Sequence, residues 1–72
     1  MNFSAALTQI KEGFQVKRAG WNGKGQYIYL LRNIINTDLP PFIVIKTIDE
    51  TLVPWVASQT DLLAEDWEVV AA

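Results

Sequence analysis

The sequence predicts an α+β domain, residues 1–72, in which an N-terminal helix packs on a small antiparallel sheet of about five strands, with a short second helix before the last strand. Three observations support this fold class. Apolar residues near the N-terminus have helical spacing, short β-rich runs are separated by turn-forming residues, and a helix-capping sequence precedes the last run. A chain of 72 residues is long enough for one such domain.

The first predicted helix begins near residue 3 and ends at Gly13. Its apolar residues recur every three or four positions, at Phe3, Leu7, Ile10 and Phe14. Asn2 or Ser4 can cap its N-terminus, and glycine is common just past the end of a helix. A helix of about nine residues does not persist alone in water. Its apolar face is therefore expected to lie on the sheet.

The predicted strands are the β-rich runs 15–18, 26–32, 42–47, 52–53 and 67–70. The first two form a hairpin around the glycine-rich segment 19–25, whereas 33–41 is a polar connection that ends in two prolines. Pro54 ends the fourth strand. The third strand is apolar on both faces, which predicts that the helix or another subunit covers its second face.

The second predicted helix begins at a capping box formed by Ser58 and Asp61 and runs through residues 62–64. In such a box the two side chains accept hydrogen bonds from N–H groups that the first turn of a helix leaves unpaired. Trp67 follows in the last strand. Because Trp67 belongs to an alternating strand pattern, we assign it to the core.

Residues 18–25, with the sequence RAGWNGKG, differ most from a plain connection. Three glycines within six residues allow positive φ and the close approach of another group. The segment also offers the flat ring of Trp21, the amide of Asn22 and the cation of Lys24, which suit a base and a phosphate. Asn-Gly is equally a strong hairpin signal, and Trp21 at the end of a strand can be an ordinary core residue. Spacing alone leaves both interpretations open.

Basic residues are concentrated around this segment. Four of the six lysines and arginines lie in residues 1–24, together with one of the eight acidic residues. The net charge of −2 argues against a protein that coats DNA, but the local positive field suits a small anion. We therefore expect a small-molecule ligand and no binding of DNA.

The chain contains neither cysteine nor histidine. It therefore lacks the thiolate and imidazole groups that commonly serve as nucleophiles, general bases and zinc ligands. Asp61, Glu65 and Asp66 lie close in sequence, but a helix cap and a solvated turn explain them better than a catalytic pair does. We expect no enzymatic activity, no catalytic residue, no bound metal and no cofactor.

Size and composition also predict the assembly and location of the protein. A core this small supplies little stability, and a hydrophobic content of 50% favours additional burial between subunits. No apolar run approaches the roughly 20 residues of a membrane helix, and no signal-peptide pattern is present. The expectation is a cytoplasmic homo-oligomer that does not bind membranes.

Two tryptophans and the capped helix complete the predicted ligand site. Trp21 and Trp55 fall outside the alternating strand pattern. Two roles therefore remain open for each of them: contact with a ligand or partner, and packing in the core. Arg18 and Lys24 are expected to hold negative charge, and the start of the second helix is expected to recognise hydroxyls or base edges. The predicted ligand-binding residues are Arg18, Trp21, Asn22, Lys24, Trp55, Ser58, Gln59 and Asp61.

Three segments, residues 2–7, 20–25 and 53–67, resemble the second Thoeris anti-defence family of small phage and prophage proteins. The third, VPWVASQTDLLAEDW, is long enough to be specific. The resemblance implies a homo-oligomer, typically a tetramer, that binds and sequesters the cyclic ADP-ribose signal of a bacterial immune system without cleaving it. Some members of this family are similar in fold but bind cyclic di- or trinucleotides. The family often has a longer segment between the second and third strands than the 33–41 connection here.

A second interpretation stays open beside this one. A small phage accessory protein that acts by protein–protein contacts would use the same apolar surface, with residues 19–25 serving only as a hairpin turn. Depletion of a cyclic nucleotide from solution separates the two interpretations.

Overall fold

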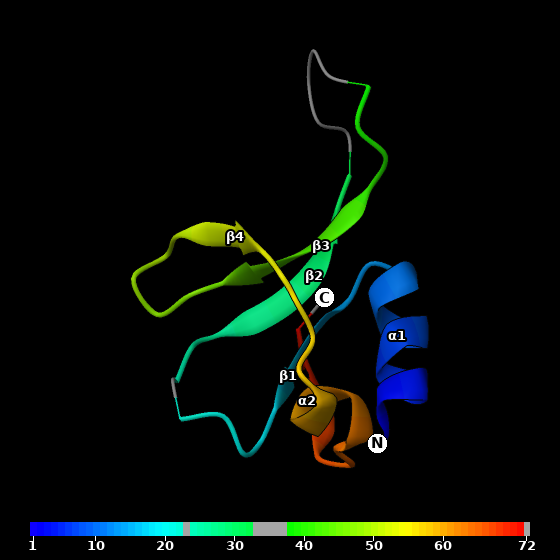
Figure 1. Ribbon diagram of the computed structural model, residues 1–72, viewed down its shortest axis with the longest axis vertical. Helices are drawn as coiled ribbons and strands as arrows, with labels where there is room; N and C mark the ends of the chain where they lie inside the picture. Colours follow the sequence, from blue (N-terminus) through cyan, green and yellow to red (C-terminus); the bar gives the residue numbers. More distant parts are fainter. Residues whose placement is uncertain (23, 33–37, 72) are drawn as a thin grey trace.

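The computed structural model describes residues 1–22, 24–32 and 38–71 (Figure 1). In chain order the elements are α1 (Phe3–Lys11), β1 (Gln15–Arg18), β2 (Tyr27–Leu31), β3 (Phe42–Lys46), β4 (Leu52–Pro54), α2 (Gln59–Leu63) and β5 (Trp67–Ala71). The predicted α+β class is confirmed, and the predicted strand ends differ from the observed ones by at most one residue. Gly23 and residues 33–37 of the predicted connection lie outside the described residues.

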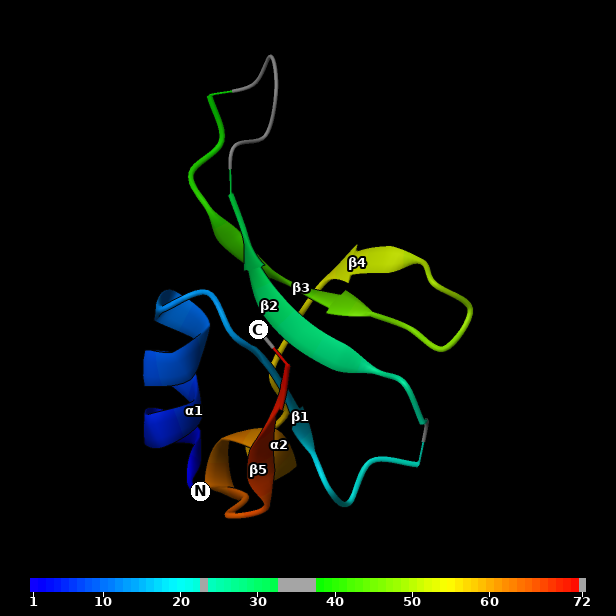
Figure 2. The same ribbon diagram turned by 180° about the vertical axis from the view of Figure 1, so that it is seen from behind.

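The five strands form one antiparallel sheet in the order β4-β3-β2-β1-β5. β1 to β4 are neighbours in the order of the chain, and β5 then returns to pair with β1 (Figure 2). In that pairing Arg18 lies opposite Trp67, and Lys17 lies opposite Glu68. The return of β5 therefore brings the start of this strand to the start of the glycine-rich segment.

The core lies between α1 and one face of the sheet. Val16, Ile28 and Ile45 are cross-strand partners and so share that face. Ala6 and Ile10 of α1 pack against it, and both are fully buried. Trp67 is only 2% exposed, which confirms its assignment to the core.

The two ends of α1 show how the sequence sets its length. Asn2 is the N-cap, and its Oδ1 accepts a hydrogen bond from the backbone N of Ala5 at 2.9 Å. Gly13 follows the C-cap with a φ of +98°, a conformation that favours glycine. The prediction that Phe14 continues the apolar face of the helix is wrong, because this turn redirects the chain into β1 before Phe14 is reached.

Replacing Asn2 with alanine is expected to lower the free energy of unfolding by about 1 kcal/mol, since the N–H of Ala5 loses its acceptor. Urea unfolding followed by circular dichroism measures this loss. Ser4→Ala is the matched control, because Ser4 lies within the first turn of α1 and was the other candidate cap. Equal destabilisation by the two changes would contradict the assignment of Asn2 as the cap.

The opposite face of the sheet is also rich in apolar side chains. Tyr29 pairs with Val44 across β2 and β3, and Leu31 pairs with Phe42. Val44 is 2% exposed although, among the described elements, neither helix packs on this face (Figures 1 and 2). The prediction that another subunit covers it stays a prediction. The helices that the structure describes are all too short or too polar to cross a membrane.

Candidate functional site

The capped helix α2 is tied to the glycine-rich segment through Asp61. The predicted capping box is present: Ser58 Oγ accepts a hydrogen bond from the N–H of Asp61 at 3.0 Å, and Asp61 Oδ2 accepts one from the N–H of Ser58 at 3.3 Å. The other carboxylate oxygen, Oδ1, accepts hydrogen bonds from Arg18 Nη1 at 3.0 Å and from Trp21 Nε1 at 3.3 Å. One carboxylate therefore fixes both the helix and the loop.

A second carboxylate, that of Asp66, holds the other side of Arg18. Arg18 Nε lies 2.9 Å from Asp66 Oδ1, and the N–H of Gly20 donates to Asp66 Oδ2 at 2.8 Å. The N–H of Ala19 donates to the carbonyl of Asp66 at 3.0 Å. A Cβ at position 20 would lie 2.8 Å from Asp66 Oδ2, so any other residue there would force the Asp66 carboxylate to shift. The start of the loop is thus fixed to the turn between α2 and β5.

Trp67 is the centre of an aromatic cluster that supports this network. Its ring centroid lies 5.3 Å from that of Phe3, 5.4 Å from that of Trp21 and 6.0 Å from that of Trp55. The last two contacts are edge to face, an arrangement that aromatic pairs prefer. Trp67 Nε1 also donates to the carbonyl of Asp61 at 3.0 Å. Trp21 and Trp55 are both half-buried, so each is part of the core packing and still partly accessible.

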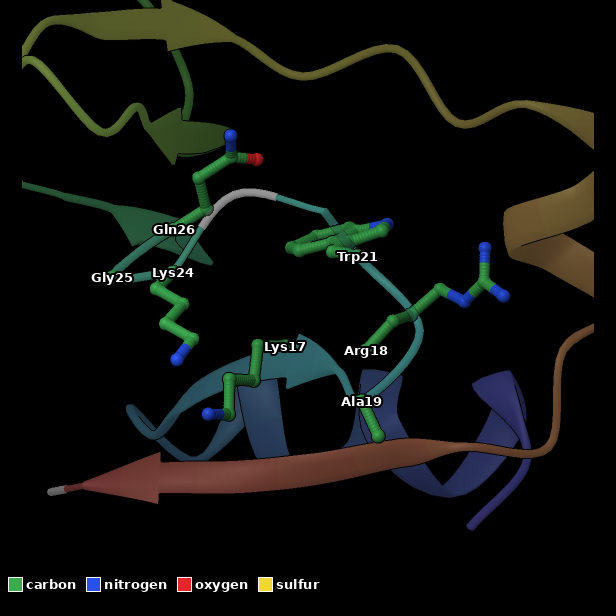
Figure 3. Close-up of a pocket in the computed structure, with 7 residues that line it drawn as sticks. All are labelled: Lys17, Arg18, Ala19, Trp21, Lys24, Gly25 and Gln26. Carbon is green, nitrogen blue, oxygen red and sulfur yellow. The ribbon is translucent and has the colours of Figure 1, made fainter.

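A cavity of about 320 Å³ opens beside Trp21 (Figure 3). Its lining consists of Lys17, Arg18, Ala19, Trp21, Lys24, Gly25 and Gln26. Figure 3 shows the ammonium groups of Lys17 and Lys24 pointing to the same side, whereas the guanidinium of Arg18 points toward α2. An aromatic face, an amide and two ammonium groups are suited to a base, ribose hydroxyls and phosphate.

The network keeps its charged groups ionised. Burial tends to raise the pKa of Asp61, but the hydrogen bonds from Arg18, Trp21 and Ser58 outweigh it and leave that pKa below its ordinary value. The pKa of Asp66 is also lowered, first by the hydrogen bond from Arg18 and then by the N–H of Gly20. Both carboxylates in turn raise the pKa of Arg18.

The lowered pKa values predict that the fold loses stability in acid. Because Asp61 and Asp66 release protons more readily in the folded chain, their contribution is complete above about pH 4–5 and is lost as the pH falls through their folded pKa values. Urea midpoints measured between pH 7 and pH 3 are expected to fall below about pH 4. The double variant Asp61→Asn, Asp66→Asn is expected to be less stable at pH 7. Its urea midpoint is expected to fall less steeply as the pH is lowered.

Asp38→Asn is the control for this experiment, since Asp38 is exposed and lies outside the network. Its urea midpoints are expected to follow those of the unmodified protein at every pH. An equally steep acid decline in the double variant would show that other carboxylates, such as Asp49, whose pKa is lowered mainly by the hydroxyl of Thr47, dominate the response.

The structure brings part of the predicted site together. Arg18, Trp21, Ser58 and Asp61 belong to one hydrogen-bonded network, and Lys24 joins Arg18 and Trp21 at the cavity. As far as the chain is described, the lining of the cavity does not include Asn22, Trp55, Ser58, Gln59 or Asp61. Asn22 and Gln59 are exposed, and Trp55 packs on Phe3 with ring centroids 5.8 Å apart. That these residues bind a ligand stays a prediction.

Three residues of this region were absent from the predicted set. Lys17 lines the cavity from β1, Gln26 lines it from the residue that precedes β2, and Asp66 anchors the loop. Lys17 alternates with Val16, so its position on the other face of β1 could have been inferred from the sequence. Asp66 depends on the pairing of β5 with β1, for which a single sequence gives no local signal. Within the described parts of the chain, no three acidic side chains are grouped in a way that would hold a metal ion.

Comparison with known proteins agrees with the resemblance in the sequence. Residues 1–70 match the family described as the Thoeris anti-defense 2-like domain. The chain is also 41% identical, over 85 residues, to the protein named Thoeris anti-defense 2 of Bacillus phage SP01, with 99% of this chain and 96% of that protein covered. Because the alignment is longer than this chain, the relative has residues that this chain lacks. The chain belongs to the Thoeris anti-defense 2-like family.

Proposed function

We propose that this protein counters Thoeris defence by binding and sequestering a cyclic nucleotide immune signal, a cyclic ADP-ribose isomer, without cleaving it. Membership of the Thoeris anti-defense 2-like family supports the anti-defence role. The protein would act in the cytoplasm of an infected or lysogenic bacterium, where such a signal is made. Cyclic di- or trinucleotides are the alternative ligands of the same site.

The observation that carries this proposal is the cavity beside Trp21. A cyclic ADP-ribose isomer presents an adenine face, ribose hydroxyls and the two negative charges of a pyrophosphate. The ring of Trp21, the amide of Gln26 and the ammonium groups of Lys17 and Lys24 complement these groups (Figure 3). The cavity volume of about 320 Å³ lies at the lower end of the range for small-molecule sites.

Sequestration suits the site better than cleavage does. The chain has no histidine or cysteine to act as base or nucleophile. Asp61 and Asp66 are hydrogen-bonded to Arg18, and their lowered pKa values make them poor proton acceptors at neutral pH. The groups beside the cavity therefore favour binding over bond breaking.

We include in this proposal a homo-oligomer, specifically a tetramer. The sheet face that bears Tyr29, Leu31 and Phe42 is rich in apolar side chains, and no described helix packs on it. Leu52, at the edge strand β4, adds a side chain that is 47% exposed. A protomer of 72 residues surrounds a nucleotide only partly, and a neighbouring copy would add the remaining walls.

Recovery of an intact ligand tests the proposal. The purified protein is mixed with cyclic ADP-ribose isomers and, separately, with cyclic dinucleotides and trinucleotides. The protein is then removed by filtration and denatured, and the released nucleotide is analysed by mass spectrometry. Recovery of a nucleotide of unchanged mass is the expected result, and size-exclusion chromatography with light scattering measures the oligomer.

Each other outcome has a definite meaning. A nucleotide of changed mass would identify an enzyme and overturn sequestration. Depletion of none of the nucleotides would favour an accessory protein that acts through protein–protein contacts. A monomeric mass in light scattering would contradict the proposed homo-oligomer. It would not change the meaning of the ligand-recovery result.

A further inference from the structure

One lysine that lines the cavity, Lys17, is paired with a carboxylate of the protein, Glu68, which is not among the lining residues. Lys17 of β1 and Glu68 of β5 are cross-strand partners, and Lys17 Nζ lies 3.5 Å from Glu68 Oε1. The two side chains are 42% and 50% exposed, so water and a ligand can reach both. Lys17 lines the cavity beside Trp21.

The positive charge available to a ligand is concentrated at this end of the cavity. Arg18 also lines the cavity, but its guanidinium donates to Asp61 and Asp66 and points toward α2 (Figure 3). Its charge is therefore offset by two carboxylates. Lys17 and Lys24 point together to the other side, and the carboxylate of Glu68 lies at Lys17.

We propose that Lys17 binds the anionic group of the nucleotide and that Glu68 is a built-in competitor for Lys17, which the ligand phosphate displaces. The inference rests on the proposed function and assigns one contact within it. Glu68 thereby weakens binding of every anion at this position, and a ligand overcomes the competition only by also engaging Trp21 and Lys24. The Lys17–Glu68 pair therefore lowers the affinity for simple anions such as inorganic phosphate.

The exchange is energetically feasible because the resident pair is weak. An ion pair this exposed contributes little to folding, since water solvates both partners and salt screens them. A pyrophosphate brings two charges and several acceptor oxygens, so it interacts more strongly with two ammonium groups than one carboxylate does with one. Lys17 can turn from Glu68 to the ligand through its four flexible side-chain torsions without a change in the sheet.

Isothermal titration calorimetry at low salt tests the exchange, with each cyclic ADP-ribose isomer or cyclic oligonucleotide that the recovery assay retains as the probe. Glu68→Gln is expected to tighten binding about 2- to 5-fold, because it removes the competitor and keeps the shape of the side chain. Lys17→Met is expected to weaken binding about 10-fold and to make affinity less sensitive to salt. In the Lys17→Met protein, adding Glu68→Gln is expected to have little further effect.

Glu50→Gln is the matched control. Glu50 forms a pair of similar length with Lys46, at 3.7 Å, with the Glu50 side chain 79% exposed, and neither residue is among those lining the cavity. Glu50→Gln removes the same charge as Glu68→Gln. If it tightened ligand binding equally, the effect would come from the general electrostatic field, and the inference would be overturned. Unchanged affinity in Glu68→Gln or in Lys17→Met would overturn it as well, while leaving sequestration intact. If the unmodified protein retains no probe, the proposed function fails and this inference fails with it.

Discussion

Replacing Trp67 with alanine is expected to leave the protein largely unfolded at 25 °C. The side chain is 2% exposed and contacts the rings of Phe3, Trp21 and Trp55. Loss of a buried tryptophan costs about 3–5 kcal/mol, which is comparable to the whole stability of a core this small. The far-UV circular dichroism spectrum and the urea unfolding curve measure the effect.

Trp67→Phe separates the two roles of this side chain. Phenylalanine keeps most of the apolar contact but cannot donate the hydrogen bond from Nε1 to the carbonyl of Asp61. An intermediate stability is expected, with a cooperative unfolding transition that is still visible. A Trp67→Ala protein that unfolds cooperatively at nearly the original urea concentration would show that the aromatic cluster is not the centre of the core.

The elements of the fold could be predicted because local residues determine them. The side chain of Asn2 caps α1, Gly13 turns the chain out of it, and Ser58 with Asp61 begins α2. Each of these signals lies within four residues of the group that it satisfies. The end of β4 at Pro54 was also predicted from a local signal. Proline has no N–H, and it is tolerated in an edge strand at a position where no hydrogen-bond donor is needed.

The candidate site could be predicted only in part, because its contacts join distant segments. Arg18 ends β1 as predicted, but its partners Asp61 and Asp66 follow 43 and 48 residues later. Only the return of β5 to β1 brings them together. The same return places Glu68 beside Lys17. Arg18, which was predicted to bind a ligand, thus has its guanidinium held by two carboxylates of the protein. Lys17, which was not in the predicted set, lines the cavity.

Trp21 shows why the structural and functional interpretations of the loop did not exclude each other. One edge of its indole donates to Asp61 and its ring packs on Trp67, as a core residue would. The ring also lines the cavity. A side chain fixed from one side loses little conformational freedom when a base stacks on it, which favours tight binding.

Replacing Trp21 with alanine is expected to weaken binding of any nucleotide that the recovery assay retains about 10- to 100-fold, since stacking of a base on an aromatic ring contributes roughly 1–3 kcal/mol. The same change also removes the ring contact with Trp67 and the hydrogen bond to Asp61, so some loss of stability is expected. Calorimetry with the nucleotide retained in the recovery assay measures affinity, and a thermal unfolding curve verifies that the variant is folded at the titration temperature.

Two further variants distinguish stacking from general loosening of the core. Trp55→Ala removes a ring with a similar edge-to-face contact on Trp67, but Trp55 is not among the residues lining the cavity, so affinity is expected to change little. Trp21→Phe keeps an aromatic face while losing the donor to Asp61, and binding is expected to be largely retained. If Trp55→Ala weakens binding as much as Trp21→Ala does, either the ligand contacts both rings or the effect passes through Trp67. If Trp21→Ala binds as tightly as the unmodified protein, the nucleotide does not stack on Trp21 and the cavity beside it is not the ligand site.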